Sequence, residues 1–289
     1  MAKKRLRHGY STGACAAAAA KGATLALCGS PVDEVSLNLP WKRGDATSRT
    51  FKLVDKLYEG GLFSCGVIKD GGDDPDVTNG MEIRATVSLL NKSEPAAHDS
   101  FPVVIEGGEG VGRVTRKGLA AEVGSPAINL VPLEMIEESV REAVRLSKAG
   151  GVAGLRVVIS APEGAERAKK TLNHRLGIVG GLSILGTNGI GIRMSAAAWE
   201  ATIDSCLDVA KAAGAKRMLL AFGRTSERAG HSLYPELAEN AAVLMGDHVG
   251  YSLDKTVERD LDAVIVGQFA KCCKVAGGHY ATHVKDSSL

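Results

Sequence analysis

The sequence predicts an α+β domain followed by a smaller Rossmann-like α/β domain with a parallel sheet. The first observation is length, because 289 residues are more than a single hydrophobic core normally serves. The second is a change of pattern near residue 195. Short alternating apolar runs give way there to strand-like and helical stretches that alternate every 20 to 25 residues or so. We therefore expect one domain over residues 1–194 and a second over residues 195–289.

The first domain is expected to begin with a long helix. Ser11 or Thr12 can cap it, an alanine run over 16–20 favours it, and Gly29 lies near its end. Alternating apolar residues then predict short strands, with turns such as Gly60-Gly61 between them. The expected strands are 35–39, 51–57, 63–68, 83–89 and 111–115.

The remaining elements of the two domains follow from similar signals. Pro132 can open a helix that Gly150-Gly151 closes. Ser195 can cap a second helix that Gly214 ends. A basic amphipathic helix is expected over 163–172. Buried strands are expected at 155–159, 217–222, 242–245 and 263–266, the last three in the parallel sheet.

Composition excludes several classes of function. A net charge of +2 and an aromatic content of 4% argue against nucleic-acid binding. No secretory signal or membrane-length apolar stretch is evident, so we expect no membrane partner. Six cysteines without a Cys-x-x-Cys pair are typical of a reduced, cytoplasmic protein. The basic residues at the start, Lys3, Lys4, Arg5, Arg7 and His8, are either a solvated arm or a contact for a polyanion.

Two segments carry unusual side chains or backbone. Residues 69–78 hold four aspartates within seven positions, which indicates a solvated turn, a general base, a Mg²⁺ site or acceptors for a ligand. Pro75 restricts Asp74 to an extended backbone, which can point its carboxylate away from its neighbour. We expect Asp73 and Asp74 to face a cleft between the domains. Residues 106–115 are rich in glycine but lack a dinucleotide fingerprint or P-loop, which leaves a β-turn or an anion-binding nest.

Two further segments resemble ligand loops. A basic helix end followed by a Gly, Ser, Thr and Asn-rich stretch, 169–191, is costly to order, which favours a ligand-binding role. The tail from Gly267 contains Lys271, Cys272-Cys273, and His279 and His283 at i, i+4 spacing. The adjacent cysteines lack zinc-ligand spacing, so we expect no protein-bound metal.

Four segments occur in an order specific enough to compare with a known family. They are Gly9-Tyr10-Ser11-Thr12-Gly13-Ala14-Cys15, Gly72-Asp73-Asp74-Pro75-Asp76-Val77-Thr78, Gly107-Gly108 to Gly112 with 127–132, and Lys170-Thr171-x-Asn173 through Arg175-Leu176-Gly177-Ile178 to Thr187. Together they resemble the CbiD family, densely over residues 8–195. The C-terminal part is looser, since Phe222-Gly223-Arg224-Thr225 stands where members tend to carry Thr-Pro-Gly-Asn. Many members are expected to continue beyond His283.

The resemblance implies methyl transfer from S-adenosylmethionine to ring carbon 1 of cobalt-precorrin-5B, giving cobalt-precorrin-6A in anaerobic cobalamin biosynthesis. Cobalt then arrives within the substrate. Asp73 and Asp74 are the expected catalytic residues, which either balance the sulfonium charge or accept a proton, and the second domain is expected to bind the cofactor. The expected substrate contacts are Thr12, Lys170, Arg175, Arg193, Lys271 and His283. The expected cofactor contacts, at the carboxyl edge of the parallel sheet, are Gly223, Asp247 and Gly267.

Two other functions stay open from the residues alone. Glycine-rich loops with clustered aspartates are also compatible with an ATP-dependent small-molecule kinase, which would bind ATP with Mg²⁺. A non-catalytic tetrapyrrole-binding protein would bind the macrocycle without S-adenosylmethionine. The sequence is also compatible with a homo-oligomer.

Overall fold

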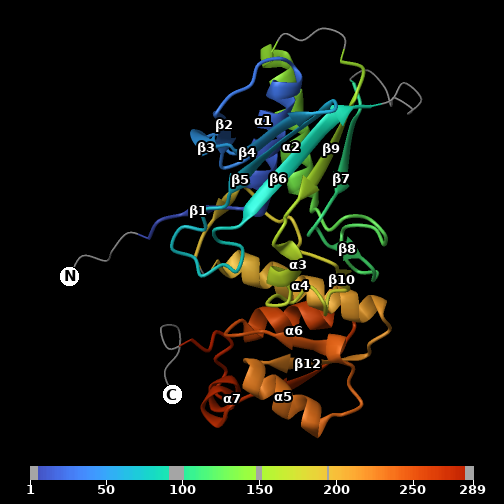
Figure 1. Cartoon of the computed structure of the whole chain (residues 1–289). Coiled ribbons are helices and arrows are strands. Elements are labelled where there is room, and N and C mark those ends of the chain that lie inside the picture. Colours follow the sequence, from blue (N-terminus) through green and yellow to red (C-terminus); the bar gives the residue numbers. More distant parts are fainter. Residues whose placement is uncertain (1–5, 91–100, 148–151, 194, 284–289) are drawn as a thin grey trace, which may run out of the picture. The chain divides into compact units, whose positions relative to one another are not determined.

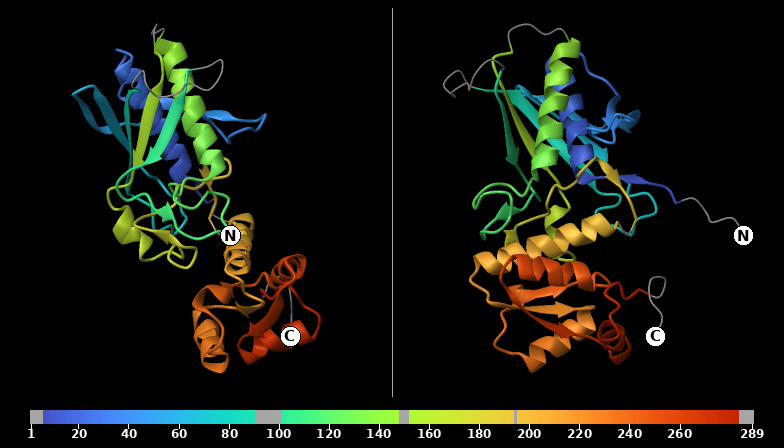
Figure 2. Two further views of the ribbon diagram at one scale, coloured as in Figure 1. Left: turned by 90° about the vertical axis from the view of Figure 1, so that its right-hand side faces the viewer. Right: turned by 180° about the vertical axis from the view of Figure 1, so that it is seen from behind.

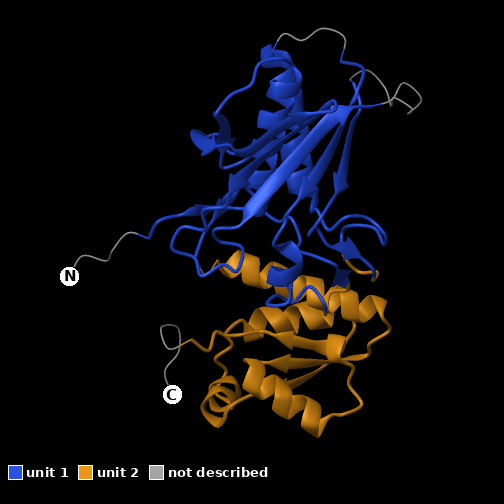
Figure 3. Cartoon of the chain, in the orientation of Figure 1, with its two compact units in different colours: residues 1–115, 120–174, 178–193 blue, residues 116–119, 175–177, 194–289 orange. Residues whose placement is uncertain are grey.

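The computed structural model describes residues 6–90, 101–147, 152–193 and 195–283. Lys3, Lys4, Arg5 and the expected helix end at Gly150-Gly151 lie outside these ranges. The chain forms two compact units (Figure 3). The first comprises residues 1–115, 120–174 and 178–193, and the second comprises 116–119, 175–177 and 194–289. The second unit thus includes two short segments, 116–119 and 175–177, that no sequence signal assigns to it.

A five-stranded mixed sheet forms the centre of the first unit (Figure 1). Its order is β4-β5-β6-β9-β7, and all neighbours are antiparallel except β7 and β9. Alternate residues of β6 and β9 are fully buried, so one face of the sheet packs against the core. The strands are β4 (Val54–Glu59), β5 (Leu62–Ile68), β6 (Glu82–Leu89), β7 (Val103–Gly107) and β9 (Leu155–Ser160).

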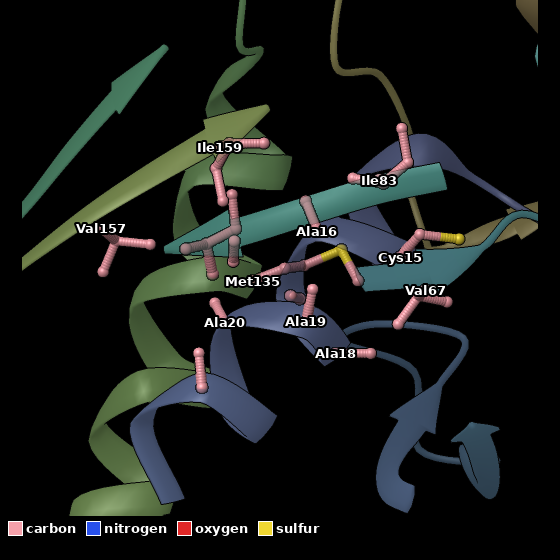
Figure 4. Packing of buried hydrophobic residues seen from close by; sticks show 14 of the residues in the cluster. Cys15, Ala16, Ala18, Ala19, Ala20, Val67, Ile83, Met135, Val157 and Ile159 are labelled. Atoms are coloured by element: carbon pink, nitrogen blue, oxygen red, sulfur yellow. The ribbon is translucent and has the colours of Figure 1, made fainter. Parts of the chain in front are cut away.

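Helices α1 (Thr12–Leu27) and α2 (Leu130–Ser147) cover that buried face (Figure 2). The alanines of α1 allow it to pack closely, because their small methyl side chains let neighbouring backbones approach. Residues 14–20 of α1, six of which are alanine, have no exposed surface. Figure 4 shows Ala16, Ala19 and Ala20 among side chains from the sheet and from Met135 of α2. Of the two residues predicted as possible caps, Ser11 caps α1 by accepting from the Ala14 amide.

Several expected elements are shorter or divided in the structure. The expected strand over 51–57 is two strands with different partners. Its first part pairs with residues 34–39, a pairing that the Leu53 amide extends by donating to the Asp33 carbonyl, whereas β4 pairs with β5. The expected helix over 163–172 ends at Ala168, because the Lys170 and Thr171 amides form tight turns instead. The small paired strands are β1 (Gly9–Tyr10), β2 (Glu34–Leu39), β3 (Thr47–Lys52), β8 (Arg113–Val114), β10 (Ile178–Val179) and β11 (Ile190–Gly191); the short helix is α3 (Gly164–Ala168).

The second unit contains a three-stranded parallel sheet with the order β13-β12-β14. Helices α4 and α6 lie on one face of it and α5 on the other (Figure 1). Ser195 caps α4 and Gly214 follows its end at φ +86°, both as predicted. The elements are α4 (Ala196–Ala212), β12 (Arg217–Ala221), α5 (Arg224–Leu233), a 3₁₀ turn (Glu239–Ala241), β13 (Ala242–Leu244), α6 (Val249–Glu258), β14 (Asp262–Val266) and α7 (Phe269–Ala276). None of the helices in the described ranges is both long and apolar enough to cross a membrane.

Glycines allow three loops of the first unit to approach one another as bare backbone. A Cβ on Gly181 or on Gly164 would lie 2.1 Å from the Gly110 carbonyl oxygen. A Cβ on Gly110 itself would lie 1.8 Å from the Ala161 carbonyl oxygen. No side chain can occupy these positions without moving the backbone, so this contact requires glycine on each loop.

We predict that Gly181→Ala destabilises the protein by about 1 to 3 kcal/mol or more, the range for forcing extra volume into a packed site. The colliding atoms are backbone, which cannot rotate away. Gly44→Ala is the matched control, because its Cβ meets nothing within 4 Å. Urea unfolding of both variants measures the difference, and equal midpoints for the two would contradict the packing argument.

Candidate functional site

The N-terminal strand brings two of the family-like segments together in the first unit. The Tyr10 amide donates to the Asp70 carbonyl at 2.8 Å, and the Ser11 amide donates to the Gly189 carbonyl at 2.9 Å. A Cβ on Gly9 would lie 2.2 Å from the backbone of Gly71. The aspartate-rich loop and the 185–191 segment therefore lie on either side of the chain that leads into α1.

A buried lysine organises the aspartate-rich loop. Lys69 is 3% exposed and its ammonium donates to Asp76 at 2.6 Å, while the Thr78 amide donates to the other oxygen of Asp76 at 2.8 Å. Burial alone would raise the pKa of the Asp76 carboxyl, but these hydrogen bonds outweigh it and lower the pKa. Asp76 is thus a structural anion of the loop.

The two aspartates with an expected catalytic role differ in their surroundings. Asp73 is exposed, and its carboxylate accepts from the Arg7 amide at 2.8 Å. The Arg7 guanidinium pairs with Asp70, and this hydrogen bond lowers the pKa of the Asp70 carboxyl. Asp74 is half-buried, and in the described part of the chain its carboxylate makes no hydrogen bond or ion pair. Of the two carboxylates, that of Asp74 therefore has fewer partners within the protein in the described residues.

The N-terminus of α1 is closed by the protein itself. The Gly13 amide donates to the Leu185 carbonyl at 2.9 Å, and the Ala14 amide donates to the Ser11 hydroxyl. The hydroxyl of Thr12, an expected substrate contact, accepts from the Leu185 amide at 2.8 Å, and Thr12 is 5% exposed. These groups hold the 185–189 segment, and they present no amide to a ligand. Burial also raises the pKa of the neighbouring Cys15 thiol to about 12, which makes it unreactive.

The glycine-rich loop at 107–112 is a packed turn. The amides of Gly108, Val111 and Gly112 donate to carbonyls of Ile159, Gly108 and Leu182, respectively. An anion-binding nest requires convergent unpaired amides. Of the two interpretations that the sequence left open, the geometry agrees with the turn.

The basic residues of the expected substrate site fall into two groups. Lys170 and Arg193 are exposed. Arg175, in the second unit, donates through both terminal nitrogens to the carboxylate of Glu227. The side chains of this pair are 12% and 5% exposed, so Arg175 already holds an anion of its own chain.

A small cavity lies at the carboxyl edge of the parallel sheet in the second unit. Its volume is about 220 Å³, and Phe222, Gly223, Arg224, Thr225, Ser226, Gln268 and Lys271 line it. The first turn of α5 contributes residues 224–226, whose amides have no acceptor within the helix. Gly223 is fully extended, and a Cβ there would meet nothing within 4 Å. The lining is therefore open, cationic and rich in hydrogen-bond donors.

A hydrogen-bonded network around Asp247 lies at the same sheet edge. Its carboxylate accepts from the Lys271 ammonium and from the Thr282 hydroxyl, the latter at 2.8 Å. Lys271 and the buried Lys274 also donate to the Thr282 carbonyl. Partial burial favours a higher pKa for the Asp247 carboxyl, but the hydrogen bonds from Lys271 and Thr282 lower it. The network fixes the chain immediately before His283, which is half-buried.

The third expected cofactor residue has a packing role. A Cβ on Gly267 would lie 2.4 Å from the Phe222 ring, so this glycine makes room for an aromatic side chain. Cys272 and Cys273 are free thiols. Among the residues that the structure describes, no three His, Cys, Asp or Glu side chains are grouped to hold a metal ion.

The sequence did not identify several residues that organise these regions. Lys69, Glu227 and Thr282 are polar residues buried in the fold, and each meets a charged partner. The partner of Lys69 lies in the same loop, whereas those of Glu227 and Thr282 are distant along the chain. Trp199 stacks on His248, with ring centroids 6.5 Å apart, beside the Asp247 loop. A signal existed for Thr282 and His248, since both lie within two residues of positions already singled out, and Lys69 begins the aspartate-rich segment. Nothing in a single sequence marks Glu227.

We predict that Asp76→Asn destabilises the protein by about 3 kcal/mol at neutral pH, because it leaves the buried Lys69 ammonium without its counterion. The folded carboxyl has a lowered pKa, so its stabilisation is complete above the ordinary aspartate value of 3.8. It is lost as the pH falls through the folded pKa. The free-energy difference between wild type and variant should stay constant from pH 7 to about 4 and shrink below.

Urea unfolding across that pH range provides the measurement. Asp74→Asn is the control and should change stability by no more than about 0.5 kcal/mol. A difference for Asp76→Asn that grows towards low pH would contradict the role assigned to the Lys69–Asp76 pair.

Comparison with known proteins assigns this arrangement to a family. The family model described as CbiD matches residues 1–193. The cobalt-precorrin-5B C(1)-methyltransferase of Geobacter metallireducens is 50% identical over 300 residues, covering 100% of this chain and 79% of that protein. The same-named protein of Geobacter sulfurreducens is 48% identical over 293 residues, with the same two coverages. A crystal structure of cobalamin biosynthesis protein (cbiD) from Archaeoglobus fulgidus is similar at 27% identity and a TM-score of 0.49, over 95% of this chain and 81% of that one. With a family-model match over 193 of its 289 residues and relatives about half identical along its whole length, the chain belongs to the CbiD family.

Proposed function

We propose that this protein transfers a methyl group from S-adenosylmethionine to ring carbon 1 of cobalt-precorrin-5B, giving cobalt-precorrin-6A in cobalamin biosynthesis. Membership of a family whose similar members carry the name cobalt-precorrin-5B C(1)-methyltransferase supports the reaction. The structural observation that carries the proposal is the cavity at the carboxyl edge of the β12–β14 sheet. Open α/β sheets bind ligands at that edge. We therefore assign the second unit as a Rossmann-like cofactor-binding domain, with the boundary near residue 194.

The residues at this edge fit the cofactor's amino-acid end. A carboxylate can accept from the first amides of α5 and from Arg224 or Lys271, all of which border the cavity. At about 220 Å³ the cavity is below the usual size for a whole ligand of roughly 300 Å³ or more, so it suits part of the cofactor. Asp247, beside Lys271, then has one carboxylate oxygen to offer a ribose hydroxyl. Gly267 makes room for the Phe222 ring, which lines the cavity.

The first unit is assigned to the substrate. When bound, S-adenosylmethionine supplies an electrophilic methyl group whose bond to sulfur breaks as the ring carbon forms its new bond. The protein's task is then to orient two reactants, and positioning accounts for much of such catalysis. Exposed Lys170 and Arg193 suit the carboxylates of the macrocycle, because ammonium and guanidinium groups bind carboxylates strongly. Cobalt enters as part of the substrate.

The aspartate-rich loop is assigned to charge and proton handling. Asp76 is used internally by Lys69, whereas Asp73 and Asp74 lie at the more accessible end of the loop. Either can accept a proton from the reacting carbon's neighbourhood or balance positive charge on the cofactor. Thr12 takes a supporting role in this proposal, since its hydroxyl holds Leu185. His283 stays a proposed substrate contact next to the Thr282 anchor.

A kinase is not favoured by these observations. Relatives at 44–50% identity along the whole chain are named methyltransferases. The glycine-rich loop that would have to bind phosphate already donates its amides to carbonyls. A non-catalytic tetrapyrrole carrier would leave the cavity in the second unit without a ligand.

All six cysteines are free, which supports a reducing compartment such as the cytoplasm.

The proposal is tested by incubating the protein with cobalt-precorrin-5B and S-adenosylmethionine. The product should gain one methyl group at carbon 1, identified by mass spectrometry and NMR with a ¹³C-labelled donor. Calorimetry should also detect binding of S-adenosylhomocysteine but not of ATP with Mg²⁺. Binding of the macrocycle without S-adenosylhomocysteine would indicate the carrier instead.

We predict that Gly223→Leu weakens S-adenosylhomocysteine binding by at least about tenfold, or 1.4 kcal/mol. The extended backbone accepts any residue, and the new side chain would fill open space that borders the cavity. Melting temperature should therefore change little. Gly44→Leu, at another open glycine, is the control for surface hydrophobicity. Unchanged affinity in Gly223→Leu would remove this cavity from the cofactor site.

We predict that at least one of Asp73→Asn and Asp74→Asn lowers the single-turnover rate by about 10² to 10⁴, the usual effect of removing a general base. Asp74→Asn should leave the melting temperature nearly unchanged, because its carboxylate makes no hydrogen bond in the described chain. Asp73→Asn should also weaken the contact with Arg7. Near-normal turnover in both variants would exclude this loop from the chemistry.

A further inference from the structure

A buried ion pair joins Glu227, at the first turn of α5, to Arg175. The two terminal nitrogens of Arg175 donate to the two carboxylate oxygens of Glu227, one of them at 3.0 Å. The Glu227 side chain is 5% exposed and that of Arg175 is 12% exposed. A guanidinium that meets a carboxylate through both nitrogens fixes orientation as well as distance. Because solvent is largely excluded, neither group has water as an easy substitute partner.

Glu227 belongs to the turn that borders the proposed cofactor cavity. Its amide donates to the Gly223 carbonyl at 2.9 Å, which closes the first turn of α5. Residues 223–226 of that same turn line the cavity, and Ser226 is itself buried. One turn further on, Gly230 sits against Leu219 of β12, where a Cβ would lie 2.6 Å from the leucine side chain. Packing of Gly230 therefore holds the helix on the sheet, and the Glu227 carboxylate ties its first turn to Arg175.

Arg175 is itself held firmly by its neighbours in the second unit. Its carbonyl accepts from the Arg116 guanidinium at 2.9 Å, and Leu176 packs against the hydrophobic core of this unit. Gly177, at φ +73°, passes over the Arg116 side chain, where a Cβ would lie 2.4 Å from it. A guanidinium on so constrained a backbone can fix the position of whatever it binds.

We infer that Arg175 is a positioning residue for the cofactor site, acting through Glu227 on the first turn of α5. The inference rests on the proposed function, since it takes the cavity at this turn as the cofactor site. It differs from the role expected from the sequence, in which Arg175 held a substrate carboxylate. Loss of the pair should loosen residues 223–226 and weaken cofactor binding, while affinity for the macrocycle stays unchanged.

The molecule provides two matched controls. Arg259 forms a second ion-pair group in the same unit, in which it donates to Asp208 at 2.7 Å and to Asp204 at 3.0 Å. That arginine is 15% exposed and joins α6 to α4, away from the residues that line the cavity. Lys170, five residues before Arg175, is the exposed cation proposed to bind the substrate. Arg259→Lys therefore reports general loss of stability, and Lys170→Ala reports loss of a substrate contact.

The experiment uses Arg175→Lys, Glu227→Gln and the double variant beside the two controls. Arg175→Lys keeps the charge but loses the planar fork, so it is the change most compatible with folding. For each protein the Kd of S-adenosylhomocysteine is measured by calorimetry, and the KM of the corrinoid at saturating donor by turnover. Melting temperature is recorded in parallel, and binding is measured well below it.

The expected result is a rise of about tenfold or more in Kd for Arg175→Lys and for Glu227→Gln. The Kd of the double variant should be no higher than that of the single variant with the higher Kd, because the pair acts as a unit. The KM of the corrinoid should stay within about twofold. Arg259→Lys should lower the melting temperature with an unchanged Kd, and Lys170→Ala should raise only the KM.

Two outcomes would overturn the inference while leaving the proposed function intact. A raised KM with unchanged Kd in Arg175→Lys would return this residue to the substrate. An equal rise of Kd in Arg175→Lys and Arg259→Lys would show that any loss of stability in this unit weakens binding. If the wild-type protein does not bind S-adenosylhomocysteine at all, the proposed function fails first and the inference fails with it.

Discussion

The burial of α1 along almost its whole length is the constraint on which the first unit depends. Residues 14–20 have no exposed surface, so every backbone group at the start of the helix must find its partner within the protein. The Leu185 carbonyl accepts from the Gly13 amide, and the Thr12 hydroxyl accepts from the Leu185 amide. The preceding strand is held in turn by Asp70 and Gly189. One buried helix thus determines where two of the loops with proposed functions must lie.

The sequence predicted best those features whose signals are local. Alanines over 16–20 with a serine before them predicted α1, and alternating apolar residues predicted β6. The helix expected over 163–172 failed for a tertiary reason. Arg167 at its end donates to the Val77 and Asn79 carbonyls, and the chain turns immediately afterwards. Helical propensity cannot anticipate such a partner 90 residues away. The parallel β7–β9 pairing also joins residues distant along the chain, so local sequence does not predict it either.

Glycine shows why the candidate site was only partly predictable. Gly110, Gly181 and Gly267 were all compatible with ligand loops, yet each removes a side chain that would collide with the protein itself. At Gly223, by contrast, an added side chain would meet open space. Composition cannot separate these cases, because packing and binding both require a backbone that another group can approach. The discriminating quantity is what lies within contact distance, which only the fold supplies.

The charged residues divide in the same way, and that division carries the functional argument. Lys69, Arg175 and Arg259 each have a carboxylate partner from the chain and little exposed surface, so their charges are used to hold loops and helices in place. Lys170 and Arg193 are exposed and can exchange water for a ligand at small desolvation cost. A basic cluster in the sequence therefore mixes two populations with opposite energetics. For a buried cation the relevant question is which element its partner positions. At Arg175 that element is the helix turn that borders the cavity of the second unit.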